Sequence, residues 1–151
     1  MSYDIYWHRR KETVYDLETG KCDESAYFSD DELKNIADLH SGICGNLETF
    51  RKPFEVESTG LNITSNLYRM FSWAVNGDST IDWKKTLHSI KGEKAEPILR
   101  NAIKRMEEEK DEAIKYNSPN GWGTYPNAIA FLKDLLAESV VYSDYYLSIN
   151  Y

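Results

Sequence analysis

The amino-acid sequence predicts an α+β fold, in which a short antiparallel sheet from the N- and C-terminal strands packs against four or five helices. Alternating apolar and polar residues at both ends of the chain indicate the strands, and apolar residues at helical spacing between them indicate the helices. The 151 residues contain no internal repeat, low-complexity tract or linker. We therefore predict a single domain over residues 1–151.

Each end of the chain carries the pattern of a half-buried strand. Near the N-terminus, Tyr3, Ile5 and Trp7 alternate with more polar residues. Apolar side chains also occupy alternate positions within residues 141–149. Because chain ends often lie close together, we expect these two strands to pair directly.

Shorter stretches next to these strands are less regular. Residues 13–15 are expected to form a second strand, followed by a turn at Thr19-Gly20. Residues 53–57 are expected to be briefly extended, and residues 61–66 are expected to be a loop that enters a helix.

Apolar spacing and capping signals predict the helices. Ser29 and Glu32 form a capping box, which predicts a helix that continues to His40. The longest apolar pattern covers residues 93–116 and contains Pro97. This proline fits a helix only if it lies in the first turn, where the missing N–H costs nothing. Further helices are predicted over residues 67–75, 83–90, 93–116 and 124–136, the last with Thr124 as its cap and Pro126 in its first turn.

The negative charge is concentrated in one segment. Residues 12–38 hold nine acidic residues and two lysines, which equals the net charge of −7 of the whole chain. Direct binding to nucleic acid is disfavoured, because it needs a basic surface. The acidic segment fits either a solubilising face or a surface that meets a basic partner.

The cysteines and the length of the apolar runs indicate in which cellular compartment the protein is expected. Cys22 and Cys44 do not form a disulfide framework, and we find no signal peptide and no apolar run long enough to span a membrane. We therefore expect a protein of the cytoplasm, with no membrane contact.

The residue types that carry metal or nucleophilic chemistry occur without a recognisable pattern. Cys22, Cys44 and the histidines His8, His40 and His88 lack the spacing of a zinc site, so we predict no metal. Cys44 and His40 are close in sequence, but a buried, inert cysteine is the simpler interpretation. We predict no catalytic residue and no cofactor.

The segment from Asn117 to Pro126 is the most unusual stretch of the chain, because it places Trp122 between Gly121 and Gly123. A large aromatic side chain in such a turn must pack on the core or bind a ligand. We predict that Trp122 is mostly buried and fixes the angle between two helices. The alternative is a ligand pocket formed by Asn66, Met70, Asn120, Trp122 and Tyr125.

The string Asn120-Gly121-Trp122-Gly123-Thr124-Tyr125, together with residues 62–71 and the Gly92 and Pro97 region, resembles an uncharacterised family of small proteins from tailed phages and prophage-bearing bacteria. The resemblance covers most of the chain and is strongest over residues 60–136. It implies a phage accessory role and assigns no catalytic residue.

Two functions are consistent with these patterns. The first is a small, acidic, non-enzymatic phage-type protein that binds and inhibits a host defence or regulatory protein at a basic surface, such as a nucleic-acid-binding groove. Its contact residues are predicted to be Asp16, Asp23, Glu24, Tyr27, Asp30 and Asp31. The alternative is a small-molecule or nucleotide-binding module, with or without hydrolytic activity, at the pocket of Asn66 and Trp122. The sequence leaves the oligomeric state open.

Overall fold

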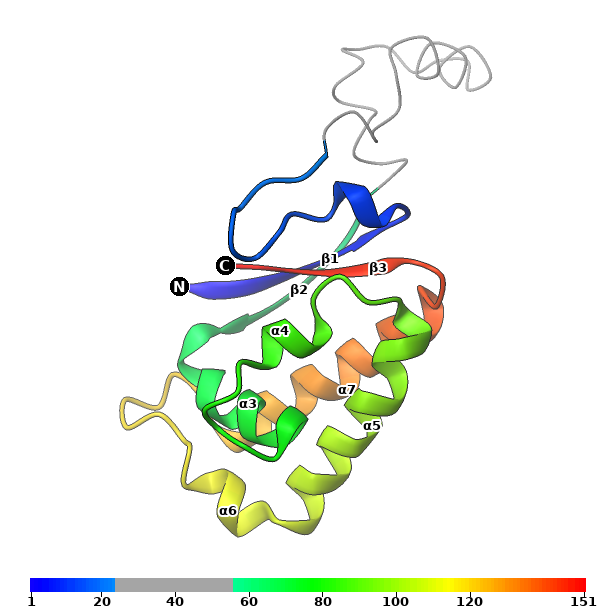
Figure 1. Cartoon of the computed structure of the whole chain (residues 1–151). Coiled ribbons are helices and arrows are strands. Elements are labelled where there is room, and N and C mark those ends of the chain that lie inside the picture. Colours follow the sequence, from blue (N-terminus) through cyan, green and yellow to red (C-terminus); the bar gives the residue numbers. More distant parts are fainter. Residues whose placement is uncertain (24–55) are drawn as a thin grey trace, which may run out of the picture.

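A computed structural model describes residues 1–23 and 56–151 of the chain (Figure 1). The helix predicted over residues 29–40 lies outside the described residues. The elements in chain order are β1 (Ser2–His8), the 3₁₀ helix η1 (Lys11–Thr13), β2 (Val56–Thr64), the 3₁₀ helix η3 (Ser65–Leu67), α3 (Tyr68–Asn76), α4 (Trp83–Leu87), α5 (Gly92–Glu108), α6 (Lys110–Ile114), α7 (Tyr125–Val141) and β3 (Tyr146–Asn150).

The three strands form one antiparallel sheet in the order β2-β1-β3. The N-terminal strand β1 is central, and Trp7 on it lies opposite Glu57 of β2 and Leu147 of β3. The predicted α+β fold and the direct pairing of the terminal strands are therefore confirmed. The C-terminal strand begins later than predicted, because α7 continues to Val141 and a turn follows it.

Only the start of the edge strand β2 was predicted, because Val56 and Glu57 belong to the stretch expected to be extended. The loop expected over residues 61–66 is wrong, since residues 61–64 continue this strand. This strand is mostly polar and half-exposed, so it lacks the apolar alternation that signals a buried face. Its pairing with β1 shifts register between Asp4 and Tyr6, and Gly60 has a positive φ of 77°. Such an irregular edge strand is defined by its pairing with β1 more than by its own sequence.

One face of the sheet carries the helices, as the side view in Figure 1 shows. Tyr3, Ile5 and Trp7 on this face are buried, together with Leu147 and Ile149 of β3. Trp7 is fully buried, and its indole Nε1 donates a hydrogen bond of 3.0 Å to Glu138 on α7. The sheet and α7 are thereby joined by a polar contact as well as by packing.

Aromatic side chains hold α3 and α4 against α7. The ring of Phe71 on α3 lies 5.0 Å from the ring of Trp83 on α4 and 5.3 Å from that of Phe131 on α7. These side chains are buried, and each aromatic ring removes a large apolar area from water, which stabilises the core. The predicted helices over residues 67–75 and 124–136 are confirmed, including Thr124 as the N-cap and Pro126 in the first turn.

In the structure, the long helix predicted over residues 93–116 departs from the prediction in two respects. It breaks at Glu109, where φ and ψ are −117° and 45°, and becomes α5 and α6. The helix also starts at Gly92, so Pro97 lies inside α5 and not in its first turn. The interior position is tolerated because Pro97 is on the exposed side and Glu93, whose carbonyl loses a donor, is exposed to solvent.

Most of the segment that follows β1 lies on the other face of the sheet (Figure 1), while residues 15–18 lie beside Lys85 and His88 at the end of α4. The strand expected over residues 13–15 is absent, and η1 leads into an irregular loop. The hydroxyl of Tyr15 donates a hydrogen bond to the carbonyl of Ile149, which fixes this loop to β3. Within the described residues, no helix has the combined length and apolar character needed to cross a membrane.

Candidate functional site

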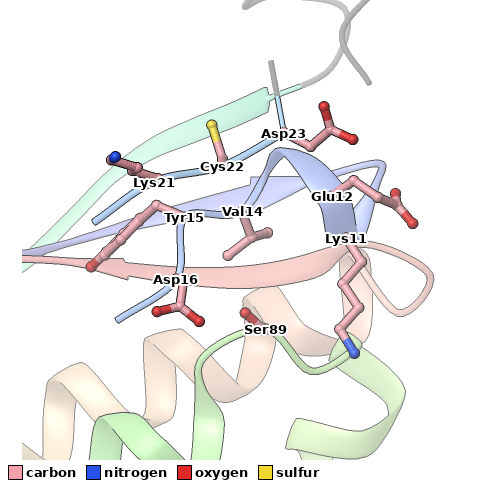
Figure 2. A pocket seen from close by; sticks show the side chains of 9 residues that line it. All are labelled: Lys11, Glu12, Val14, Tyr15, Asp16, Lys21, Cys22, Asp23 and Ser89. Carbon is pink, nitrogen blue, oxygen red and sulfur yellow. The ribbon is translucent and has the colours of Figure 1, made fainter. Parts of the chain in front are cut away.

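A pocket of about 390 Å³ lies between the loop of residues 11–23 and Ser89 (Figure 2). Figure 2 shows charged side chains of both signs at this pocket, because the loop contains both lysines and carboxylates. The lining residues are Lys11, Glu12, Val14, Tyr15, Asp16, Lys21, Cys22, Asp23 and Ser89. With both signs present, the pocket does not select one class of charged ligand.

Asp16, one of the predicted contact residues, is engaged within its own loop. Its Oδ1 accepts hydrogen bonds of 2.8 Å from the backbone N–H groups of Glu18 and Thr19. These bonds favour the charged carboxylate and hold the pKa of Asp16 below its ordinary value. Asp16 therefore stabilises a turn, and its contact with a partner stays a prediction.

Of the other predicted contact residues in the acidic segment, the structure describes only Asp23. Asp23 is exposed and lines the same pocket. Glu24, Tyr27, Asp30 and Asp31 lie outside the described residues.

His88 connects the loop to the sheet. Its Nδ1 accepts a hydrogen bond of 3.0 Å from the N–H of Ile149, so the proton is on Nε2, which donates to the carbonyl of Tyr15 at 2.7 Å. Burial lowers the pKa of His88, because the charged imidazolium loses its hydration. A neutral His88 is thus a structural link between residues 15 and 149.

His8 lies under the same loop. Its Nδ1 is 2.8 Å from the Oγ1 of Thr13, and the hydroxyl of Thr13 donates to the carbonyl of Arg10 at 2.9 Å. The Thr13 oxygen therefore accepts the proton on Nδ1 of His8. Burial, with a smaller contribution from the neighbouring His88, lowers the pKa of His8 to about 4.

The described residues hold no group of three or more His, Cys, Asp or Glu side chains arranged for a metal ion. Cys22 is half-buried at the pocket of Figure 2 and forms no disulfide within this part of the chain. Cys44 and His40 lie outside the described residues.

The second candidate region is the loop between α6 and α7, and here the prediction for Trp122 is wrong. Trp122 is 73% exposed, so it does not plug the core. The loop itself is well ordered by hydrogen bonds: the N–H of Ser118 donates to the carbonyl of Gly123 at 2.8 Å, and the N–H of Trp122 donates to Oδ1 of Asn120 at 3.0 Å. An exposed tryptophan is thus held on a closed turn.

The base of the Trp122 loop is packed on the core. A Cβ atom added to Gly123 would lie only 3.1 Å from Cγ of the fully buried Leu67 and 3.4 Å from Cβ of Asn66. The residue that anchors the loop is Tyr125, which is buried and whose hydroxyl donates to the carbonyl of Met106 at 3.1 Å. The sequence pattern therefore predicted an aromatic anchor correctly but assigned it to the wrong residue.

The five residues of the alternative ligand pocket do not line one cavity. Asn66 is exposed, and Asn120 shapes the turn. Met70 is fully buried in α3, and Tyr125 is buried below the loop. Ligand binding by this set of residues stays a prediction, but Met70 and Tyr125 are not available at the surface.

A different pocket of about 330 Å³ lies beside the Trp122 loop. The lining residues are Asn66, Arg69, Lys115, Tyr116, Asn117, Ser118 and Pro119. Arg69 on α3 places its guanidinium 5.6 Å from the ring centre of Tyr116, in a cation–π contact. No sequence pattern indicated Arg69 and Tyr116, because their contact depends on how α3 packs against the end of α6.

The Trp122 loop and this pocket are adjacent, because Asn117, Ser118 and Pro119 of the pocket wall belong to that loop, and together they contain tryptophan, tyrosine and arginine. These are the three residue types that most often supply the binding energy of protein–protein interfaces. We call this surface the Trp122 site and define it as Trp122, Tyr116, Arg69, Asn66 and Lys115.

No protein-family model matches the chain, and neither a curated protein nor a solved structure is significantly similar to it. The resemblance to small phage proteins therefore stays a prediction.

Proposed function

We propose that the chain is a protein-binding factor, of the phage-accessory type that its sequence resembles, and that Trp122 is the main anchor for its partner. The observation that carries this proposal is the 73% exposure of Trp122 on a hydrogen-bonded loop. A tryptophan held in water by ordered backbone can bury a large apolar area against a partner, and tryptophan is enriched at interfaces.

The free energy available from this side chain is large enough for an anchor. A tryptophan buries about 150–250 Å² on full burial, so covering the exposed part of Trp122 contributes about 3–4 kcal/mol at 25 cal/mol per Å². Because the bonds from Ser118 and Asn120 already order the loop, little conformational entropy is lost on binding. Both terms favour a partner that covers Trp122.

The acidic segment of residues 12–38 has a second role in this proposal. Its charge attracts a basic region of the host partner and speeds their encounter, while the Trp122 site supplies most of the affinity. Inhibition of the host protein follows if the complex blocks a basic functional surface. Replacing Asp23, Glu24, Asp30 and Asp31 with lysine is expected to slow association and weaken its salt dependence, and unchanged rates at low salt contradict this role.

The proposal is tested by capture from a bacterial lysate with immobilised wild type, Trp122→Ala and Val141→Ala. Val141 is a suitable control because it is 74% exposed and lies at the opposite end of α7 from the loop. We expect a discrete protein that wild type and Val141→Ala retain and that Trp122→Ala loses, with an affinity reduced by about thirty-fold or more. Circular dichroism checks that the variants are folded.

Equal retention by Trp122→Ala and wild type contradicts the proposal. A loss that Val141→Ala reproduces also contradicts it, since it points to non-specific adhesion of exposed apolar side chains.

A further inference from the structure

The pocket beside Trp122 differs in charge from the rest of the molecule. The chain as a whole has a net charge of −7, but the residues that line this pocket include Arg69 and Lys115 and no carboxylate. The remaining lining is made of amide, hydroxyl and ring groups, among them Asn66 and Tyr116. The pocket therefore favours a negatively charged group.

Arg69 is the cation that is available for such a group. Within the part of the chain that the structure describes, it forms no ion pair, and its guanidinium is held against the ring of Tyr116. Lys115 differs, because its Nζ lies 2.7 Å from Oε2 of Glu112, which partly neutralises it. Glu112 does not line the pocket.

The side chain of Asn117 adds a donor next to these cations. Its Oδ1 accepts a hydrogen bond of 2.8 Å from the backbone N–H of Tyr125 at the base of the loop. The amide NH₂ on the other side of Asn117 has no partner among the described residues. A planar guanidinium and an amide donor together suit the two oxygens of a carboxylate, which accept a forked pair of hydrogen bonds.

The pocket and Trp122 are close enough to meet one partner segment. Ser118 and Asn117 in the pocket wall belong to the same loop as Trp122, and the bond from Ser118 to Gly123 closes that loop. Asn66 in the wall also lies against Gly123, the residue after Trp122.

We infer that the pocket of Arg69 binds a carboxylate from an acidic segment of the protein partner, in which an Asp or Glu lies within a few residues of an apolar side chain that covers Trp122. This inference rests on the proposed protein-binding role of Trp122. The acidic partner segment is distinct from the basic region that residues 12–38 attract. The partner is thus recognised at two surfaces. Its basic region meets residues 12–38, and its acidic segment meets the pocket of Arg69.

The test uses defined probes with the full chain labelled with ¹⁵N. The probes are a capped pentapeptide with two glutamates beside a leucine, the same peptide with two glutamines, and inorganic phosphate. Binding is followed by the NMR signals of the Arg69 Nε–H and the Trp122 Nε1–H at low ionic strength, where exposed charge pairs are least screened.

We expect the glutamate peptide to shift both signals and to bind about ten-fold or more tightly than the glutamine peptide. Arg69→Gln should remove this preference, and Arg69→Lys should keep only part of it, because lysine lacks the planar fork. Arg100→Gln is the matched control, since Arg100 is an exposed arginine of α5 paired with Glu96, and it should leave binding unchanged.

Equal binding of the two peptides overturns the inference, as does a glutamate preference that survives in Arg69→Gln. Binding of phosphate as tight as that of the glutamate peptide also overturns it, because the pocket then selects phosphorylated groups. The two proposals fail separately: loss of the lysate partner by Trp122→Ala but not by Arg69→Gln contradicts only the carboxylate pocket. Loss by Arg69→Gln but not by Trp122→Ala contradicts the anchor, and with it the apolar contact on Trp122 that the inference places beside the carboxylate.

Discussion

Acid should destabilise this protein through His8, and the size of the effect follows from its environment. His8 is 7% exposed, and burial lowers its pKa from an ordinary value near 6.5 to about 4. The unfolded chain therefore binds more protons than the folded one between these two values. The contribution to stability is fully present above pH 6.5 and is lost as the pH falls toward 4.

The linkage relation gives the magnitude. For one histidine with these two pKa values, the free energy of unfolding decreases by about 2 kcal/mol between pH 7 and pH 5. Burial lowers the pKa of His88 as well, so its contribution has the same sign. The wild type should therefore lose at least about 2 kcal/mol over this interval from its two buried histidines.

His8→Asn isolates the contribution of His8, because asparagine cannot titrate but can keep an N–H donor for the hydroxyl of Thr13. We expect the variant to be less stable than wild type at pH 7, through lost packing, but to lose about 2 kcal/mol less on going to pH 5. Urea unfolding followed by circular dichroism at both pH values measures the difference. Equal losses in the two proteins refute the reasoning, because His8 then titrates alike in the folded and unfolded states.

Three further substitutions test the packing around the helices by the same urea assay. Gly92→Ala should destabilise by about 2 kcal/mol although alanine favours helices, because its Cβ would lie 2.4 Å from the backbone oxygen of Tyr142; an increase in stability contradicts this close approach. Tyr125→Ala should cost about 3–5 kcal/mol, as expected for a buried aromatic residue that anchors a loop. Trp122→Ala should change stability by less than about 0.5 kcal/mol, because the side chain is exposed; similar losses at positions 122 and 125 contradict the assignment of the anchor.

The sequence predicted the elements whose burial pattern is regular. Alternation at Tyr3 and Trp7 located β1, and the apolar stripe around Phe71 located α3, because in both cases one face of a regular element meets the core. Most of the edge strand β2 escaped prediction because its residues face solvent on much of their surface, so its position depends on pairing with β1. Local patterns are informative only where burial is periodic.

The candidate site was only partly predictable for a similar reason. The loop of Trp122 was found from its glycines and aromatic residues, but which of Trp122 and Tyr125 is buried depends on the direction in which the turn leaves α6. A hydrogen bond from Tyr125 to Met106 fixes that direction, and no local pattern encodes it. Arg69 and Tyr116 meet only because α3 packs beside the end of α6, a contact between segments far apart in the sequence.

The most direct test of the central claim places a photo-crosslinking amino acid, p-benzoylphenylalanine, at position 122 and, in a second protein, at position 141. Both side chains are exposed in the native protein, at opposite ends of α7. Irradiation in a bacterial lysate should give a discrete adduct with one protein from position 122 and none from position 141. The absence of an adduct from position 122, or the same adducts from both positions, contradicts the claim that Trp122 anchors a protein partner.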